Sequence, residues 1–236
     1  MKKTRVIAIE GIDGSGKSVQ FQLLAQACKD RGLTVQQREY PVYHSYFGGA
    51  VGRLLSGQAG VQADQVDGKS MALWFALDRW EDLQNYRDGQ ADVLLINRYV
   101  LSNGVYQSIR EIDLGKPDLV DWVFDLEYNH FGLPRADVFV FYDVEPAQAG
   151  ENVLKKGRRD YLGSECRDVY EASGGIQRRA REKYLESAAR REDILVIQCM
   201  QAGCFRTPAD ISREDKEYLV TITACLLYTS PSPRDP

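Results

Sequence analysis

The sequence predicts a three-layer α/β fold, in which a five-stranded parallel sheet is flanked by helices on both faces. Three observations support this prediction. Short apolar runs alternate along the chain with longer segments of helical periodicity, and the first apolar run ends in a glycine-rich turn that leads into a helix. The length of 236 residues suits one globular domain. Alternation of strands with helices is typical of a parallel sheet, because each parallel connection needs a crossover.

The beginning of the chain contains a strand, a loop, a helix and a second strand. Residues 6–10 form an apolar run that we interpret as the first strand. Residues 17–31 place Phe21 and further apolar side chains at helical spacing, and Gly32 is positioned to end that helix. A second strand is then expected at residues 33–39.

The rest of the chain continues the alternation. We expect further strands at residues 93–97, 138–143 and 194–198, and helices near residues 67–86, 99–109, 117–131, 146–155, 171–191 and 208–223. The basic segment near 156–170 has no apolar period and is interpreted as a mobile lid loop. Residues 225–236 end in Ser-Pro-Ser-Pro-Arg-Asp-Pro, a composition that cannot join a core. We therefore predict one domain over residues 1–224, followed by a non-native tail.

Composition excludes several classes of protein. A formal net charge of -4 argues against a nucleic acid polymer as partner. The sequence has no apolar run of the roughly 20 residues that span a bilayer and no signal-peptide pattern, so we expect a cytoplasmic protein without a membrane partner. The five cysteines have neither zinc-site nor disulfide spacing, and we expect reduced thiols at Cys28, Cys166, Cys199, Cys204 and Cys225.

A phosphate-binding loop follows the first predicted strand directly. The pattern G-x-x-x-x-G-K-[ST] is matched by Gly11-Ile12-Asp13-Gly14-Ser15-Gly16-Lys17-Ser18, and we expect these residues and Val19 to bind a nucleotide. The glycines let successive backbone N–H groups face an anion, and the following helix adds the positive end of its dipole. Lys17 would reach the β and γ phosphates, and Ser18 would ligate Mg2+. The motif therefore predicts a P-loop fold that uses a nucleoside triphosphate with magnesium.

The loop alone does not distinguish a kinase from a nucleotide-hydrolysing switch. The rest of the chain, to about residue 222, resembles the thymidylate kinase family. The likeness lies in the loop with Ile9 and Glu10, and in Tyr40-Pro41, Trp74-Phe75-Ala76-Leu77-Asp78-Arg79-Trp80 and Arg98-Tyr99-Val100-Leu101-Ser102-Asn103-Gly104-Val105-Tyr106-Gln107. Asp125-Leu126-Glu127 with Phe131-Gly132-Leu133-Pro134 is similar to a branch of that family in Firmicutes-type bacteria. The resemblance implies transfer of the ATP γ-phosphate to dTMP by a Mg2+-dependent nucleoside monophosphate kinase, which in this family is commonly a homodimer.

The resemblance also implies an acceptor site. Phe75 and Arg79 lie four residues apart, so on a helix they share one face, where a ring could stack on a pyrimidine and a guanidinium could donate to its carbonyl oxygen. Core packing and a surface charge are the alternatives for this pair. Arg98 would bind the acceptor phosphate, and Asp13 would accept a hydrogen bond from the sugar 3′-hydroxyl.

The remaining acceptor residues follow from the same resemblance. Asn103 and Gln107 would address the base edge, and the Tyr106 ring would lie under the sugar and exclude a 2′-hydroxyl, although all of these could instead be helix surface. The aromatic residues Tyr40 and Tyr43 would surround the acceptor or pack at its rim. Catalysis is then expected from Lys17, Arg98 and Asp13, assisted by a lid arginine that we do not choose among Arg158, Arg159 and Arg167.

The chain departs from the family at several positions. Many members carry aspartate where this chain has Asn97, and arginine where it has Val42. The phosphate loop also lacks the internal arginine of some relatives. A neutral amide attracts a cation more weakly than a carboxylate does, so turnover could be slower. Two alternatives therefore stay open: a kinase for another nucleoside or nucleotide, and a nucleotide-binding module with reduced turnover.

Overall fold

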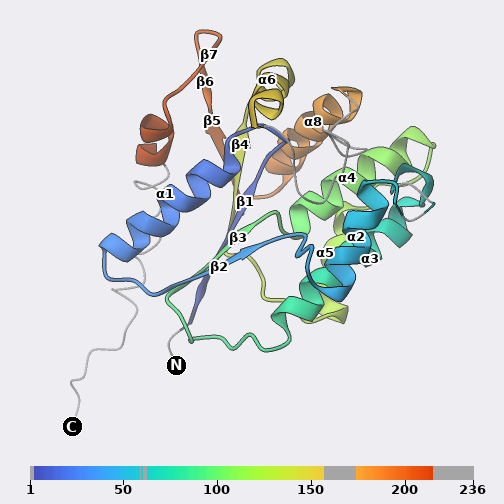
Figure 1. Ribbon diagram of the computed structural model, residues 1–236, viewed down its shortest axis with the longest axis horizontal. Helices are drawn as coiled ribbons and strands as arrows, with labels where there is room; N and C mark the ends of the chain where they lie inside the picture. The colour runs from blue at the N-terminus through green and yellow to red at the C-terminus, as the bar shows by residue number, and fades with distance from the viewer. Residues whose placement is uncertain (1–2, 59, 61–62, 157–173, 215–236) are drawn as a thin grey trace.

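The central sheet contains five parallel strands in the order β2-β3-β1-β4-β5. The computed structural model describes residues 3–58, 60, 63–156 and 174–214. The strands are β1 (Arg5–Glu10), β2 (Val35–Glu39), β3 (Val93–Asn97), β4 (Val138–Asp143) and β5 (Ile194–Gln198). Figure 1 shows α1 (Lys17–Asp30) on one side of this sheet and α4 (Val100–Asp113) and α8 (Gly174–Arg190) on the other. The predicted three-layer fold with a five-stranded parallel sheet is confirmed.

The other helices complete the two outer layers and the rim. They are α2 (Tyr46–Leu55), α3 (Gly68–Leu83), α5 (Val120–Asp125) and α6 (Pro146–Lys156), with a 3-10 turn at Ala63–Gln65 and a π-helical turn at Leu126–His130. A small hairpin joins β6 (Met200–Gln201) to β7 (Cys204–Phe205). Within the described residues, no helix combines the length and apolar character needed to cross a membrane.

Helix α2 was missed because its residues are poor helix formers. Gly48, Gly49 and Gly52 lie within it, and glycine costs about 1 kcal/mol per position relative to alanine. Two contacts offset this cost. Ser45 caps the helix by accepting a hydrogen bond from the Gly48 N–H at 3.0 Å. A Cβ at Gly48 would lie only 2.1 Å from the Val42 carbonyl oxygen, so glycine lets the two segments pack closely.

The helix predicted at residues 117–131 was wrong in its form. The chain forms α5 and then a π-helical turn, and helical structure begins only at Val120. The Asp118 carboxylate accepts hydrogen bonds from the Ser108 hydroxyl at 2.7 Å and from the Val120 N–H at 2.8 Å, so it ties the start of α5 to α4. The predicted lid and tail lie outside the described residues, as do Cys166 and Cys225. Cys28, Cys199 and Cys204 are free thiols.

The strand register brings polar residues to one edge of the sheet. In parallel pairing, Glu39 of β2 lies opposite Asn97 of β3, and Ile9 of β1 also lies opposite Asn97. Strand β1, at the centre of the sheet, is buried over Val6–Glu10. Ligands of open α/β sheets collect at the carboxyl ends of the strands, close to the point where the strand order reverses. We therefore expect a ligand-binding site at this edge of the sheet.

The core should tolerate truncation far less at β3 than on the outer face of α4. Ile96 is fully buried, whereas Ile112 is 45% exposed. Ile96→Ala should lower the free energy of unfolding by about 2–5 kcal/mol, because it removes buried surface and leaves a cavity. Ile112→Ala, the matched control, should change it by about 0.5 kcal/mol or less. Urea unfolding measures both, and equal losses would contradict the assignment of β3 to the core.

Candidate functional site

The phosphate loop has the backbone conformation that its glycines allow. Gly11, Gly14 and Gly16 have φ values of 151°, 82° and 87°, a region that side chains rarely adopt. A Cβ at Gly14 would lie 2.0 Å from the carbonyl oxygen of Ala149 in α6. Gly16 is the N-cap of α1 and provides no side-chain cap. The first turn of α1 therefore presents backbone N–H groups to a ligand rather than to a capping side chain.

The Lys17 ammonium lies across the loop. It donates hydrogen bonds to the carbonyl oxygens of Gly11 at 2.9 Å and Ile12 at 2.6 Å, and the residue is only 7% exposed. A buried cation held above a turn of glycine N–H groups concentrates positive potential there. The loop can thus bind an anion through both its backbone and Lys17.

A cavity of about 410 Å³ lies between this loop and helices α3 and α4. From the loop, its lining includes Gly14, Gly16, Lys17 and Ser18, whereas Gly11, Ile12, Ser15 and Val19 do not line it. All residues predicted for the acceptor line the same cavity: Asp13, Tyr40, Tyr43, Phe75, Arg79, Arg98, Asn103, Tyr106 and Gln107. Arg158, Arg159 and Arg167 lie outside the described residues. The structure thus brings both predicted half-sites together, while their individual roles stay predictions.

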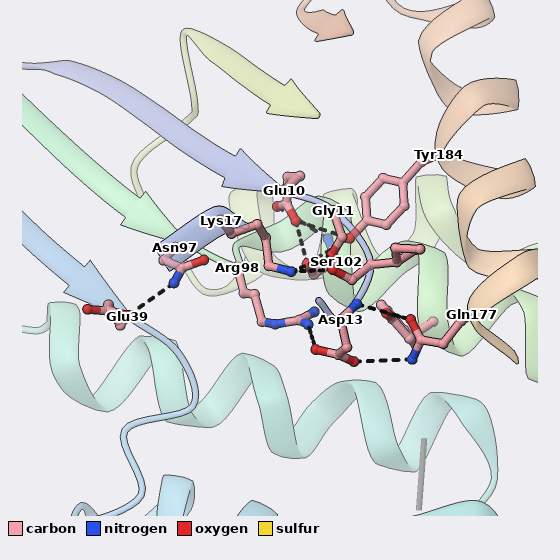
Figure 2. A network of polar contacts seen from close by, with 12 residues as sticks. Glu10, Gly11, Asp13, Lys17, Glu39, Asn97, Arg98, Ser102, Gln177 and Tyr184 are labelled. Carbon is pink, nitrogen blue, oxygen red and sulfur yellow. Dashed lines mark hydrogen bonds and ion pairs between the residues drawn. The ribbon is translucent and has the colours of Figure 1, made fainter. Parts of the chain in front are cut away.

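Asp13 connects three elements around the cavity. Its carboxylate forms an ion pair with Arg98 and accepts a hydrogen bond from the Gln177 amide at 3.1 Å. Its backbone N–H donates to the Gln177 side-chain oxygen at 3.1 Å, and the Tyr106 hydroxyl lies 3.2 Å from that same oxygen. Figure 2 shows Asp13 between Arg98 and Gln177. Gln177 of α8 was not predicted, because a glutamine within a polar helix carries no local sequence pattern.

Arg98 follows β3 in an unusual backbone conformation. Its φ of 65° is rare for a residue with a side chain, and its N–H donates to the Ile9 carbonyl oxygen at 3.0 Å. The guanidinium lies 5.7 Å from the centre of the Tyr106 ring. Burial by itself would lower the pKa of Arg98, but Asp13 and the other groups around the guanidinium together outweigh burial and hold this pKa well above its usual value. A permanent positive charge therefore faces the cavity.

Arg79 is held by a buried carboxylate. Its Nε and one terminal nitrogen donate to the two oxygens of Glu127, each at 2.6 Å, and the two side chains are 2% and 0% exposed. Such a bidentate pair fixes the plane of the guanidinium. The motif Asp125-Leu126-Glu127 indicated a branch of the family, but it did not predict Glu127 as a site residue. Tertiary structure alone reveals that it orients Arg79.

Two amides at the cavity have orientations that their neighbours determine. Asn103 donates from Nδ2 to the Ala72 carbonyl oxygen at 3.0 Å and to Glu127 at 2.8 Å, so its Oδ1 must point elsewhere. Gln107 accepts at Oε1 from Arg110 at 2.7 Å, so its Nε2 remains as a donor. Within the described part of the chain, neither Asn103 Oδ1 nor Gln107 Nε2 has a hydrogen-bond partner, although both are buried. Two residues that line the cavity thus carry one unsatisfied acceptor and one unsatisfied donor.

Asp78 anchors the segment that carries Pro41 and Tyr43. Its carboxylate accepts a hydrogen bond from the Val42 N–H at 3.1 Å and one from the Ser45 hydroxyl at 3.4 Å. Burial raises the pKa of Asp78 to about 6, although the nearby Arg79 guanidinium opposes this shift. The position of the cavity wall at Pro41 and Tyr43 therefore depends on a carboxyl group that is costly to ionise.

The donors for a metal ion are few. Among the residues that the structure describes, no three His, Cys, Asp or Glu side chains come together. Mg2+ commonly keeps several waters and binds through one or two protein oxygens plus substrate phosphates. The Ser18 hydroxyl at the cavity suits that mode of binding. The donor set fits a cation that arrives with a nucleotide.

The parallel sheet, the glycine loop at its carboxyl edge and a cavity with two further arginines define a P-loop phosphotransferase. Comparison with known proteins narrows this class. A family model for thymidylate kinase matches residues 9–202. The chain belongs to the thymidylate kinase family.

Individual relatives agree with this assignment. A thymidylate kinase from Mycobacterium tuberculosis is 34% identical over 188 residues, which cover 78% of this chain and 86% of the relative. A protein from Thermococcus kodakarensis, described as a probable thymidylate kinase, is 30% identical over 201 residues, or 83% of this chain and 89% of the relative. The solved structure of a thymidylate kinase from Candida albicans has the same fold, with a TM-score of 0.70 and 20% identity over 94% of this chain and 93% of that one.

Asp78→Asn should remove the part of the pH dependence of the free energy of unfolding that the Asp78 carboxyl group causes. The folded protein binds the Asp78 proton more tightly than the unfolded chain, whose aspartates have a pKa of about 3.9. The resulting stabilisation is complete below that value and is lost as the pH rises through about 6. Relative to the variant, the wild type should therefore lose about 1–3 kcal/mol between pH 4 and pH 7, measured by urea unfolding.

The control for this experiment is Asp64→Asn, which removes an exposed carboxylate outside the cavity lining. It should follow the wild type at every pH. Parallel stability curves for wild type and Asp78→Asn would show that the Asp78 proton is not bound more tightly in the folded state.

Proposed function

We propose that this chain transfers the γ-phosphate of ATP to dTMP and so produces dTDP. Its family is that of thymidylate kinases, which are nucleoside monophosphate kinases. The observation that carries the choice of base is the pair of oriented amides. Asn103 offers only an acceptor, because turning the amide over would place its oxygen against the Ala72 carbonyl and the Glu127 carboxylate. That acceptor suits the N3–H of thymine, whereas cytosine has an unprotonated N3 that would oppose it.

The other groups around the cavity suit the same base. Gln107 Nε2 and the Arg79 guanidinium are donors, and thymine carries two carbonyl oxygens. The Phe75 ring lines the cavity one helical turn from Arg79 and can stack on a pyrimidine. Leaving a buried donor or acceptor unpaired costs about 1–3 kcal/mol, so a base with the wrong pattern is penalised.

For the sugar and the acceptor phosphate, we assign Tyr106, Asp13 and Arg98. The Tyr106 ring is held by its hydroxyl contact to Gln177 and by the Arg98 guanidinium above it, so it is a rigid wall for the sugar. Arg98 carries a permanent charge that can bind the phosphate, and Asp13 can accept from the 3′-hydroxyl. Tyr40 and Tyr43 enclose the acceptor from the side of β2.

For ATP, we assign the phosphate loop from Gly11 to Val19. The backbone N–H groups and Lys17 would hold the β and γ phosphates, and the Ser18 hydroxyl would ligate Mg2+. When bound there, Mg2+ would supply positive charge that offsets the negative charge of the transferring phosphate. An oxygen of the acceptor phosphate then attacks the γ phosphorus while the bond to the β-phosphate oxygen breaks, and positioning by Lys17 and Arg98 supplies much of the rate. A lid arginine among Arg158, Arg159 and Arg167 would complete charge neutralisation.

A homodimer and a cytoplasmic location also belong to this proposal. Tyr46, Leu73 and Trp80 of α2 and α3 are 74%, 38% and 40% exposed. Large apolar side chains on neighbouring helices are typical of a surface that a second subunit covers.

The substrate panel is the direct test. ADP release should be fastest with dTMP, and dCMP should be used at least about 100-fold less efficiently, because it lacks the N3–H. Lys17→Ala should lower activity at least about 100-fold while the variant still folds and unfolds cooperatively. Similar efficiencies for dCMP and dTMP would favour another nucleotide kinase. An absence of dTMP-dependent ADP release would favour a binding module with reduced turnover.

Tyr106→Ala should relax discrimination at the sugar. Removing the ring opens space for a 2′-hydroxyl, so the ratio of kcat/KM for dTMP to that for its ribonucleotide should fall by about tenfold or more. Tyr106→Phe is the matched control, because it removes only the hydroxyl that contacts Gln177 and should keep the ratio within about threefold. An unchanged ratio in Tyr106→Ala would place sugar selection elsewhere.

A further inference from the structure

Glu39 and Asn97 form a pair at the carboxyl edge of the sheet. They lie opposite each other in the register of β2 and β3, and both line the cavity. The Asn97 Nδ2 donates a hydrogen bond to a Glu39 carboxylate oxygen at 3.0 Å. Figure 2 shows this contact beside Lys17 and Arg98. A carboxylate is therefore present next to position 97, although that position itself is an amide.

The oxygen of Asn97 is a buried acceptor without a donor. Asn97 is only 8% exposed, and its Oδ1 has no hydrogen-bond partner among the described residues. The contact with Glu39 determines the amide orientation, because turning it over would place two oxygens together. Figure 2 shows this oxygen on the side where Lys17 and Arg98 lie. Burying such an atom is unfavourable unless a ligand supplies a donor.

The negative charge of Glu39 favours a ligand that is a cation. Its partner in the described part of the chain is the neutral Asn97 amide, and no salt bridge of Glu39 is present there. A carboxylate in a cavity built for phosphates repels them unless a cation lies between. Both residues line the cavity, and a carboxylate and an amide oxygen complement a hydrated Mg2+, whose waters are hydrogen-bond donors. Chloride or free phosphate would not suit these acceptors.

We propose that Glu39 and Asn97 together hold the hydration shell of the Mg2+ that accompanies ATP, and that Glu39 supplies the carboxylate that Asn97 lacks. The proposal rests on the proposed function, because that function brings ATP with Mg2+ to the phosphate loop. It assigns Glu39 a role that the motif resemblance did not include. At this end of the sheet the negative charge then lies at Glu39 of β2 and not at position 97 of β3.

The test measures how strongly Mg2+ and nucleotide binding are coupled. Calorimetry gives the Kd of a non-hydrolysable ATP analogue with EDTA and with saturating Mg2+, and the ratio of the two values reports the metal contribution. Glu39→Gln should reduce this ratio by about tenfold, because it weakens binding with Mg2+ while the Kd in EDTA stays equal to that of wild type or falls as the repulsion by Glu39 is removed. The Mg2+ concentration for half-maximal dTMP phosphorylation should rise by a similar factor.

A double variant that moves the carboxylate from position 39 to position 97 is the sharpest test. The double variant Glu39→Gln with Asn97→Asp returns a carboxylate to the edge and should restore the ratio to within about threefold of wild type. Glu192→Gln is the matched control, because Glu192 is an exposed carboxylate that precedes β5 at the opposite end of the sheet. It should behave as wild type.

Two results would overturn the proposal: an unchanged ratio in Glu39→Gln, or a reduced ratio that the double variant does not restore. Failure of the proposed function is distinguishable from both. A wild type without dTMP-dependent turnover could still show the coupling, and an active wild type could lack it.

Discussion

The ion pair between Arg98 and Asp13 is the contact on which the geometry of the cavity depends. Arg98 directly follows β3 and Asp13 lies in the loop after β1, and these strands are neighbours in the sheet. Gln177 extends the contact to α8 by binding both the carboxylate and the N–H of Asp13. A glycine-rich loop has high conformational entropy when unfolded, so such contacts are needed to hold one conformation. The nucleotide loop and the acceptor wall consequently form one unit.

A buried charge pair orients polar groups in the proposed acceptor wall. Desolvating Arg79 and Glu127 is costly, and a buried ion pair is not in itself strong evidence for stability. Here Glu127 also accepts from Asn103, so the same carboxylate determines the direction of a guanidinium and of an amide. Orientation is therefore the clearest effect of this pair, since a base edge is distinguished only when donors and acceptors cannot exchange places.

The carboxyl edge of the sheet places a carboxylate beside an amide. The family resemblance leads to the expectation of aspartate at position 97, and β2 places Glu39 directly opposite Asn97 there. A cation near the phosphates responds to the local sum of charge and to the acceptor atoms within reach, not to one residue position. A departure from a motif therefore has to be judged together with its neighbours in the sheet.

The sequence by itself determined the fold class, the five strands of the central sheet and the phosphate loop, and its family resemblance pointed to nine of the residues that line the cavity. These features are local: apolar periodicity, glycines before Lys17, and motifs whose spacing places side chains on one helical face. It did not determine α2, where close packing at Gly48 outweighs poor helix propensity, nor the form of the chain after Asp118. The roles of Gln177, Glu127 and Glu39 likewise required the tertiary structure. Each acts through a partner distant in sequence, and only folding decides which side chains meet across strands and helices.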